Sequence, residues 1–132
     1  MTTAVDTSVL LAIAKAEPSA RAWVSRLAEA RHAGALLACE IVWAETRVFY
    51  RTAEVHASAM AALGVQFNPI EEAGAALAGE LHGAYRKAGG KRDRLIPDFL
   101  IGTHALTQAG QLATADAGFF RNYFNGLKIV SL

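Results

Sequence analysis

Short apolar segments alternate with longer stretches of helical periodicity along the whole chain. The expected strands are Thr3–Val5, Ala35–Ala38, Val65–Asn68, Leu112–Thr114 and Lys128–Ser131. The expected helices are Val9–Lys15, 19–33, Glu40–Thr52, Glu54–Leu63, Glu71–Lys87 and Asp98–Ala109, with a short helix or turn at Asp116–Tyr123. Because parallel strands need long crossover connections, this order predicts an α/β fold with a mostly parallel sheet of about four to five strands between helices.

The length and composition favour one folded domain. The 132 residues are 53% hydrophobic and 19% charged, which is too apolar for a disordered chain. No repeat or linker divides the sequence, so we expect a single domain over residues 1–132.

Neither a membrane span nor a secretory signal is expected. The longest apolar stretch, Ala33–Cys39, is far shorter than the roughly 20 residues of a membrane helix. The N-terminus has no basic region before its apolar residues, so we expect a cytoplasmic protein. The net charge of +1 gives no general affinity for nucleic acid, and any such affinity must be local.

Aspartates follow two of the predicted strands. Asp6 comes directly after the first, and Asp116 comes just after the fourth. Ligands of open α/β sheets bind at this carboxyl edge, although an acid there can also simply cap the next helix. Asp98 lies in the first turn of an almost wholly apolar helix, where the alternative is a favourable interaction with the helix dipole.

Glu45 is the acid that the helical periodicity makes most informative. It falls within an apolar stripe formed by Ile41, Ala44, Val48 and Phe49, which we expect to face the core. An unpaired carboxylate in such a stripe would be costly, so a partner is expected. A surface residue with a long reach remains the alternative, and Glu40 is interpreted as a solvated first-turn acid.

Four carboxylates at one edge of a sheet would repel one another unless a cation joined them. Oxygen ligands without a cysteine or histidine favour Mg²⁺ or Mn²⁺ over zinc. The four histidines are interpreted as ordinary surface or core residues.

Four segments together resemble the PIN domain, and in particular the VapC toxins of bacterial and archaeal toxin–antitoxin pairs. They are Ala4–Ser8, the mid-helix Glu45, Ile96–Ala105 and Leu112–Asp116, in the family's order and spacing. The match weakens after Asp116, where an Ala-Gly-Phe-Phe run replaces a more polar one, so no catalytic role is carried onto Arg121 or Asn122.

The resemblance implies a metal-dependent endoribonuclease, the toxin of a VapBC-type system. Its catalytic and metal-ligating residues would be Asp6, Glu45, Asp98 and Asp116, holding Mg²⁺ (or Mn²⁺) that activates water for hydrolysis of RNA phosphodiester bonds. Ser8 and Thr114 match hydroxyl positions that would orient carboxylates or water. The resemblance also implies a homodimer and a small antitoxin partner that places an arginine among the acids.

A basic segment leads into the helix that carries Asp98. It contains Arg86, Lys87, Lys91, Arg92 and Arg94, five of the thirteen basic residues, around a Gly-Gly pair. We expect it to hold the RNA backbone beside the acids, and the alternative is a solvated run of charge. For the whole chain, the alternative function is a PIN-like interaction module without catalytic activity that binds RNA or a protein partner.

Overall fold

The computed structural model describes residues 1–91 and 94–132. Its strands are β1 (Thr3–Val5), β2 (Leu36–Ala38), β3 (Val65–Phe67), β4 (Gln111–Ala113) and β5 (Lys128–Val130). Its helices are α1 (Thr7–Ala14), α2 (Ala20–Ala33), α3 (Glu40–Arg47), α4 (Ala53–Leu63), α5 (Glu72–Lys87), α6 (Ile96–Gln108) and α7 (Ala117–Tyr123). The predicted α/β fold is confirmed.

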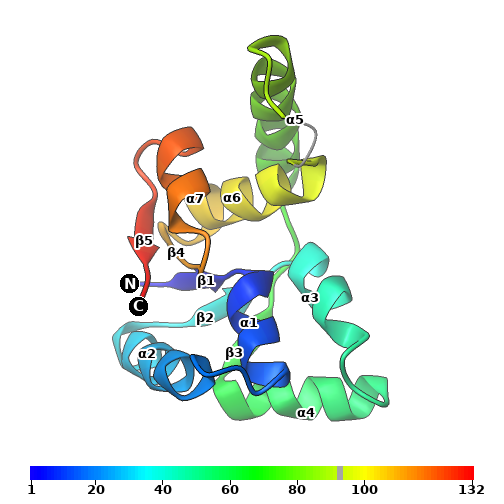
Figure 1. Ribbon diagram of the computed structural model, residues 1–132, viewed down its shortest axis with the longest axis vertical. Helices are drawn as coiled ribbons and strands as arrows, with labels where there is room; N and C mark the ends of the chain where they lie inside the picture. The colour runs from blue at the N-terminus through cyan, green and yellow to red at the C-terminus, as the bar shows by residue number, and fades with distance from the viewer. Residues whose placement is uncertain (92–93) are drawn as a thin grey trace.

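The strands of the described residues form one five-stranded sheet in the order β3-β2-β1-β4-β5, and every neighbouring pair is parallel. Helices α1 to α4 lie on one side of this sheet and α5 to α7 on the other (Figure 1). The chain changes sides when it passes from β3 to β4, across the central strand β1. The strand order therefore reverses beside β1, and open α/β sheets bind their ligands at such a switch point, outside the carboxyl ends of the strands.

Helix α6 packs closely on the sheet because its surface is apolar on several sides. Phe99, Ile101 and Ala105 are buried in it. Gly102 lies against the ring of Phe124, where a Cβ atom would clash. This packing fixes the N-terminal turn of α6 above the carboxyl ends of β1 and β4. None of the helices in the described part of the chain is long and apolar enough to cross a membrane.

Helix α3 ends at Arg47, before the predicted end at Thr52. The chain turns after it, and the Thr52 hydroxyl instead caps α4 by accepting a hydrogen bond from the Val55 N–H (3.1 Å). The expected apolar stripe is wrong, since Val48 is 74% exposed and Phe49 45% exposed. The face of α3 that packs on the core carries Val42 and Thr46, which are four residues apart. Glu45 does not lie on this face.

Candidate active site

Asp6 is the most buried of the four predicted acids. It follows β1, with 6% of its surface exposed, beside the end of β4 because Val5 pairs with Ala113. Its Oδ2 atom accepts hydrogen bonds from the hydroxyls of Ser8 (2.7 Å) and Thr114 (2.8 Å). Burial raises the pKa of Asp6, these hydroxyls lower it, and Asp98 raises it further, with a net rise. The site therefore holds one carboxylate in a fixed position.

The hydroxyls that hold Asp6 are themselves fixed by backbone N–H groups. Ala115 N–H donates to Ser8 Oγ (3.0 Å), and Asp116 N–H donates to Thr114 Oγ1 (2.9 Å). Each hydroxyl therefore accepts from the backbone and donates to the acid. This arrangement ties the start of α1 to the turn between β4 and α7.

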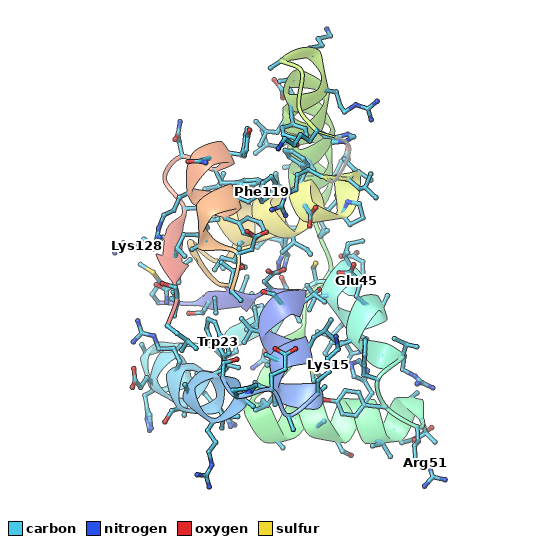
Figure 2. All side chains as sticks on the ribbon, in the orientation of Figure 1. Lys15, Trp23, Glu45, Arg51, Phe119 and Lys128 are labelled. Atoms are coloured by element: carbon cyan, nitrogen blue, oxygen red, sulfur yellow. The ribbon has the colours of Figure 1, made fainter. Side chains whose placement is uncertain are left out.

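Glu45 approaches the carboxyl end of β1 from the side of β2, the other strand that neighbours β1. It lies on α3, which follows β2, and its Oε1 atom accepts a hydrogen bond from the hydroxyl of Thr7 (2.7 Å). Figure 2 shows Glu45 on α3 beside the first helix. The side chain is exposed, so it can move more freely than Asp6.

Asp98 connects the other acids electrostatically. It is partly buried in the first turn of α6. Burial raises its pKa, the Arg94 guanidinium and the Leu95 backbone lower it, and Glu45 and Asp116 raise it, with a net rise. Asp98 thus lies close enough to Asp6 to affect its pKa, and Glu45 and Asp116 lie close enough to affect the pKa of Asp98.

Arg94 lies within this group of acids. Its Nη1 atom is 2.6 Å from Asp116 Oδ2 and 3.9 Å from Asp98 Oδ2. The guanidinium carbon also lies over the ring of Phe119, 4.3 Å from the centroid. The Arg94 side chain is 28% exposed. We call Asp6, Glu45, Asp98 and Asp116 the acid cluster, and Arg94 is its basic neighbour.

The other described basic residues of the predicted RNA-binding segment are more exposed than Arg94. Arg86, Lys87 and Lys91 are exposed, and Arg92 lies outside the described residues. The Tyr85 hydroxyl donates a hydrogen bond to the Lys91 carbonyl (2.9 Å), which fastens the segment to the end of α5.

The donor set suits a hard divalent cation, because the side chains of the acid cluster and its three hydroxyl neighbours offer only oxygen. Within residues 1–91 and 94–132, however, no three His, Cys, Asp or Glu side chains stand close enough together to hold a metal ion. Asp116 and Asp98 face the guanidinium of Arg94, and Glu45 faces Thr7. Metal binding would therefore require these exposed or partly exposed side chains to turn toward Asp6.

The sequence analysis did not point to Thr7 or Phe119, and it assigned Arg94 to RNA rather than to the acids. The N-cap of α1 is Asp6, and the Thr7 hydroxyl donates a hydrogen bond to Glu45. The spacing of Arg94 four residues before Asp98 was an available signal for their ion pair. No signal in the sequence pointed to Phe119 as the ring beneath Arg94.

Glu40 also differs from its interpretation as a solvated acid. Its Oε1 atom accepts a hydrogen bond from the Ile70 N–H (2.9 Å), so it secures the loop after β3. This structural role leaves Glu45 as the acid of α3 within reach of the cluster.

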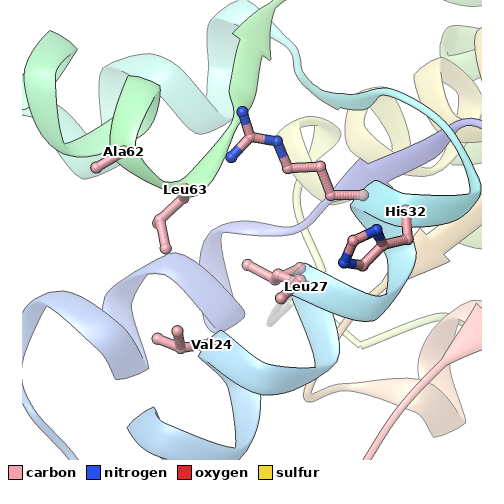
Figure 3. Close-up of a pocket in the computed structure, with 7 residues that line it drawn as sticks. Val24, Leu27, His32, Ala62 and Leu63 are labelled. Atoms are coloured by element: carbon pink, nitrogen blue, oxygen red, sulfur yellow. The ribbon is translucent and has the colours of Figure 1, made fainter.

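A cavity of about 410 Å³ lies elsewhere, between α2 and the end of α4 (Figure 3). Val24, Leu27 and Leu63 give it an apolar wall, and Arg31 and His32 lie at its side. It shares no residue with the acid cluster and lacks a carboxylate among its lining residues.

Comparisons with known proteins give a family and a fold. The profile of the PIN domain matches residues 3–125. The fold is similar to VapBC2 from Rickettsia felis bound to a DNA fragment from their promoter, with a TM-score of 0.78 and 17% identity over 99% of this chain and 98% of that one.

Two further solved structures have the same fold. VapBC-1 from nontypeable Haemophilus influenzae gives a TM-score of 0.72 with 21% identity, covering 99% of this chain and 98% of that chain. FitAcB from Neisseria gonorrhoeae gives 0.60 with 17% identity, covering 96% and 95%. No curated protein matches the sequence.

Proposed function

The chain belongs to the PIN domain family, and from this premise we propose that it is a metal-dependent endoribonuclease, the toxin of a VapBC-type toxin–antitoxin pair. The observation that carries the proposal is the group of four carboxylates at the switch point of the sheet. Burial raises the pKa of Asp98, and the charges of Glu45 and Asp116 raise it further. Mutually repelling acids in a partly buried site are typical of a place where a cation binds and chemistry occurs.

Asp6, Glu45, Asp98 and Asp116 would hold Mg²⁺, for which Mn²⁺ can substitute. When bound, the cation would supply Lewis acidity, which activates water and stabilises the charge that develops on the phosphate oxygens. Ser8 and Thr114 orient Asp6 by donating to its Oδ2 atom, and these hydrogen bonds lower its pKa against the effect of burial. Thr7 orients Glu45 by donating a hydrogen bond to its Oε1 atom.

RNA must approach this acidic edge against the repulsion between carboxylates and phosphates. We assign its attraction to the exposed Arg86, Lys87 and Lys91, because each presents a positive charge to solvent on the segment that leads into α6. Arg92 stays part of the proposal on the sequence alone. Arg94 is already paired with acids, so its part is treated separately below.

The toxin assignment implies a small antitoxin that covers the acid cluster, and a cytoplasmic site of action where RNA is available. Solved structures of similar fold carry the names VapBC and FitAcB, and the first of them contains promoter DNA. A homodimer is also proposed. The exposed Val48 and Phe49 after α3 offer apolar surface for it, whereas Trp23 is only 2% exposed and packs in the core.

The test compares the purified parent with Asp98→Asn on structured RNA in Mg²⁺ and in EDTA. We expect cleavage by the parent in Mg²⁺ only, and a rate at least about a hundredfold lower for Asp98→Asn. Expression in cells tests the toxin role, since Asp98→Asn should no longer arrest growth. RNA binding without cleavage by the parent would instead favour the non-catalytic interaction module.

A further inference from the structure

Arg94 is an unusual neighbour for residues that would hold a divalent cation. Its guanidinium lies 2.6 Å from Asp116 and 3.9 Å from Asp98, on the side of the acid cluster that faces α7. A cation and a guanidinium compete for the same carboxylate oxygens. Arg94 therefore bears on how the cluster takes up its metal.

The position of Arg94 is defined by more than one contact. The ring of Phe119 lies under the guanidinium at 4.3 Å, a geometry in which a cation and an aromatic face attract each other. Phe119 is itself only 6% exposed and packs edge to face against Phe99, so the ring is rigid. Phe119 belongs to the Ala-Gly-Phe-Phe run that replaces a more polar run after Asp116, and polar side chains would not provide such an aromatic surface.

We propose that Arg94 is an internal counter-ion of the acid cluster, seated on Phe119, and that a divalent cation must displace it from Asp116 and Asp98 in order to bind. This inference rests on the proposed function, since it concerns the same metal. A guanidinium contributes a single positive charge to two carboxylates, and Mg²⁺ contributes two. The cation therefore wins at sufficient concentration, but Arg94 raises the concentration that is needed.

The arrangement has a physical consequence for the protein without metal. Arg94 offsets the repulsion between Asp98 and Asp116, and lowers the pKa of Asp98 that burial raises. Loss of Arg94 should therefore destabilise the metal-free protein and strengthen its affinity for metal. A residue with a purely structural role would produce only the first effect.

The test measures Mn²⁺ and Mg²⁺ binding to the full chain without RNA, by calorimetry, for the parent, Arg94→Gln and Arg94→Lys. Because the ion pair is partly exposed, we expect Arg94→Gln to bind metal about three- to tenfold more tightly than the parent. Arg94→Lys keeps the charge but loses the planar guanidinium and its stacking on Phe119. Its metal affinity should lie between those of the parent and Arg94→Gln. Arg121→Gln removes the same charge from an exposed position on α7 and should change the affinity less than about twofold.

Thermal unfolding of the same proteins gives a second readout. In EDTA, Arg94→Gln should unfold at a lower temperature than the parent, and saturating Mn²⁺ should raise its unfolding temperature by more than that of the parent. If Arg94→Gln does not fold, Arg94→Lys alone must show tighter metal binding than the parent.

Two results would overturn the inference, and they have different meanings. Equal or weaker metal binding by Arg94→Gln and Arg94→Lys would refute the displacement of Arg94 and leave the proposed nuclease intact. Failure of the parent and all variants to bind either metal would remove both the inference and the metal-dependent function.

Discussion

Asp6 and Asp116 follow neighbouring strands of the sheet, yet their side chains are held in different ways. Asp6 is buried and accepts hydrogen bonds from the hydroxyls of Ser8 and Thr114. Asp116 has a side chain that is 40% exposed and pairs with the guanidinium of Arg94. Hydroxyls fix the direction of a carboxylate without neutralising it, whereas an arginine neutralises it. Under the proposed function, the fixed acid would be ready for a cation, whereas the paired acid would first have to exchange its partner.

Removal of the fixed acid should have the largest effect. Asp6→Asn keeps an oxygen that can accept from Ser8 and Thr114, but it loses the charge of a metal ligand. We expect the rate of RNA cleavage in Mg²⁺ to fall at least about a hundredfold. Single-turnover assays at saturating RNA check this, and a rate within tenfold of the parent would show that Asp6 is not a ligand.

The hydroxyl that orients Asp6 should matter somewhat less. Thr114→Val keeps the shape and removes the donor, and we expect metal affinity to fall by about 10- to 100-fold. The matched control is Thr107→Val on α6, whose hydroxyl donates to the Thr103 carbonyl away from the acids. If both variants bound Mn²⁺ equally well, the fixed position of Asp6 would be irrelevant to metal binding.

The exposed basic residues should act on RNA binding rather than on the acids. Replacing Arg86 and Lys91 with alanine should weaken binding and make the plot of log affinity against log salt shallower by up to about 1.4 for single-stranded RNA. The control replaces Arg21 and Arg51, which are exposed elsewhere, and should leave the slope nearly unchanged. An unchanged slope in the first variant would assign the segment to solubility or to a protein partner.

The smallest expected effect is on the unfolding temperature of the metal-free protein. Asp6→Asn should raise it, whereas Asp116→Asn should leave it unchanged or lower it. Burial raises the pKa of Asp6, so between the ordinary pKa of aspartate and this raised value the folded state binds more protons than the unfolded state. Stability then falls as the pH rises through that window. Asp6→Asn removes this loss, and its unfolding temperature in EDTA at neutral pH should exceed that of the parent by about 2–5 °C.

Asp116→Asn serves as the comparison. It loses the ion pair with Arg94, so its unfolding temperature should equal or fall below that of the parent. Melting curves from pH 4 to pH 8 test both variants, and the advantage of Asp6→Asn should disappear at the acidic end. A lower unfolding temperature for Asp6→Asn at neutral pH would contradict the raised pKa.

The sequence was sufficient to predict the α/β fold, and it placed Asp6 and Asp116 at one edge because they follow two neighbouring parallel strands. The sequence singled out Glu45 by an apolar stripe that is wrong, because the stripe assumed a helix extending to Thr52. Helix α3 ends at Arg47, and only tertiary contacts, such as the turn before the Thr52 cap, decide where it stops. The pairing of Arg94 with Asp116 joins residues far apart in the chain and has no periodic signature.

The N–H groups of Ala115 and Asp116 are bonded to the hydroxyls of Ser8 and Thr114, which also hold Asp6. Exchange of these two amide protons with solvent deuterium must therefore break contacts that orient the acid. Their exchange rates would report the fraction of molecules whose site is momentarily disassembled, without any substrate. A slow rate at both amides would mean that the site opens only when the β4 and α1 segments separate as one cooperative unit.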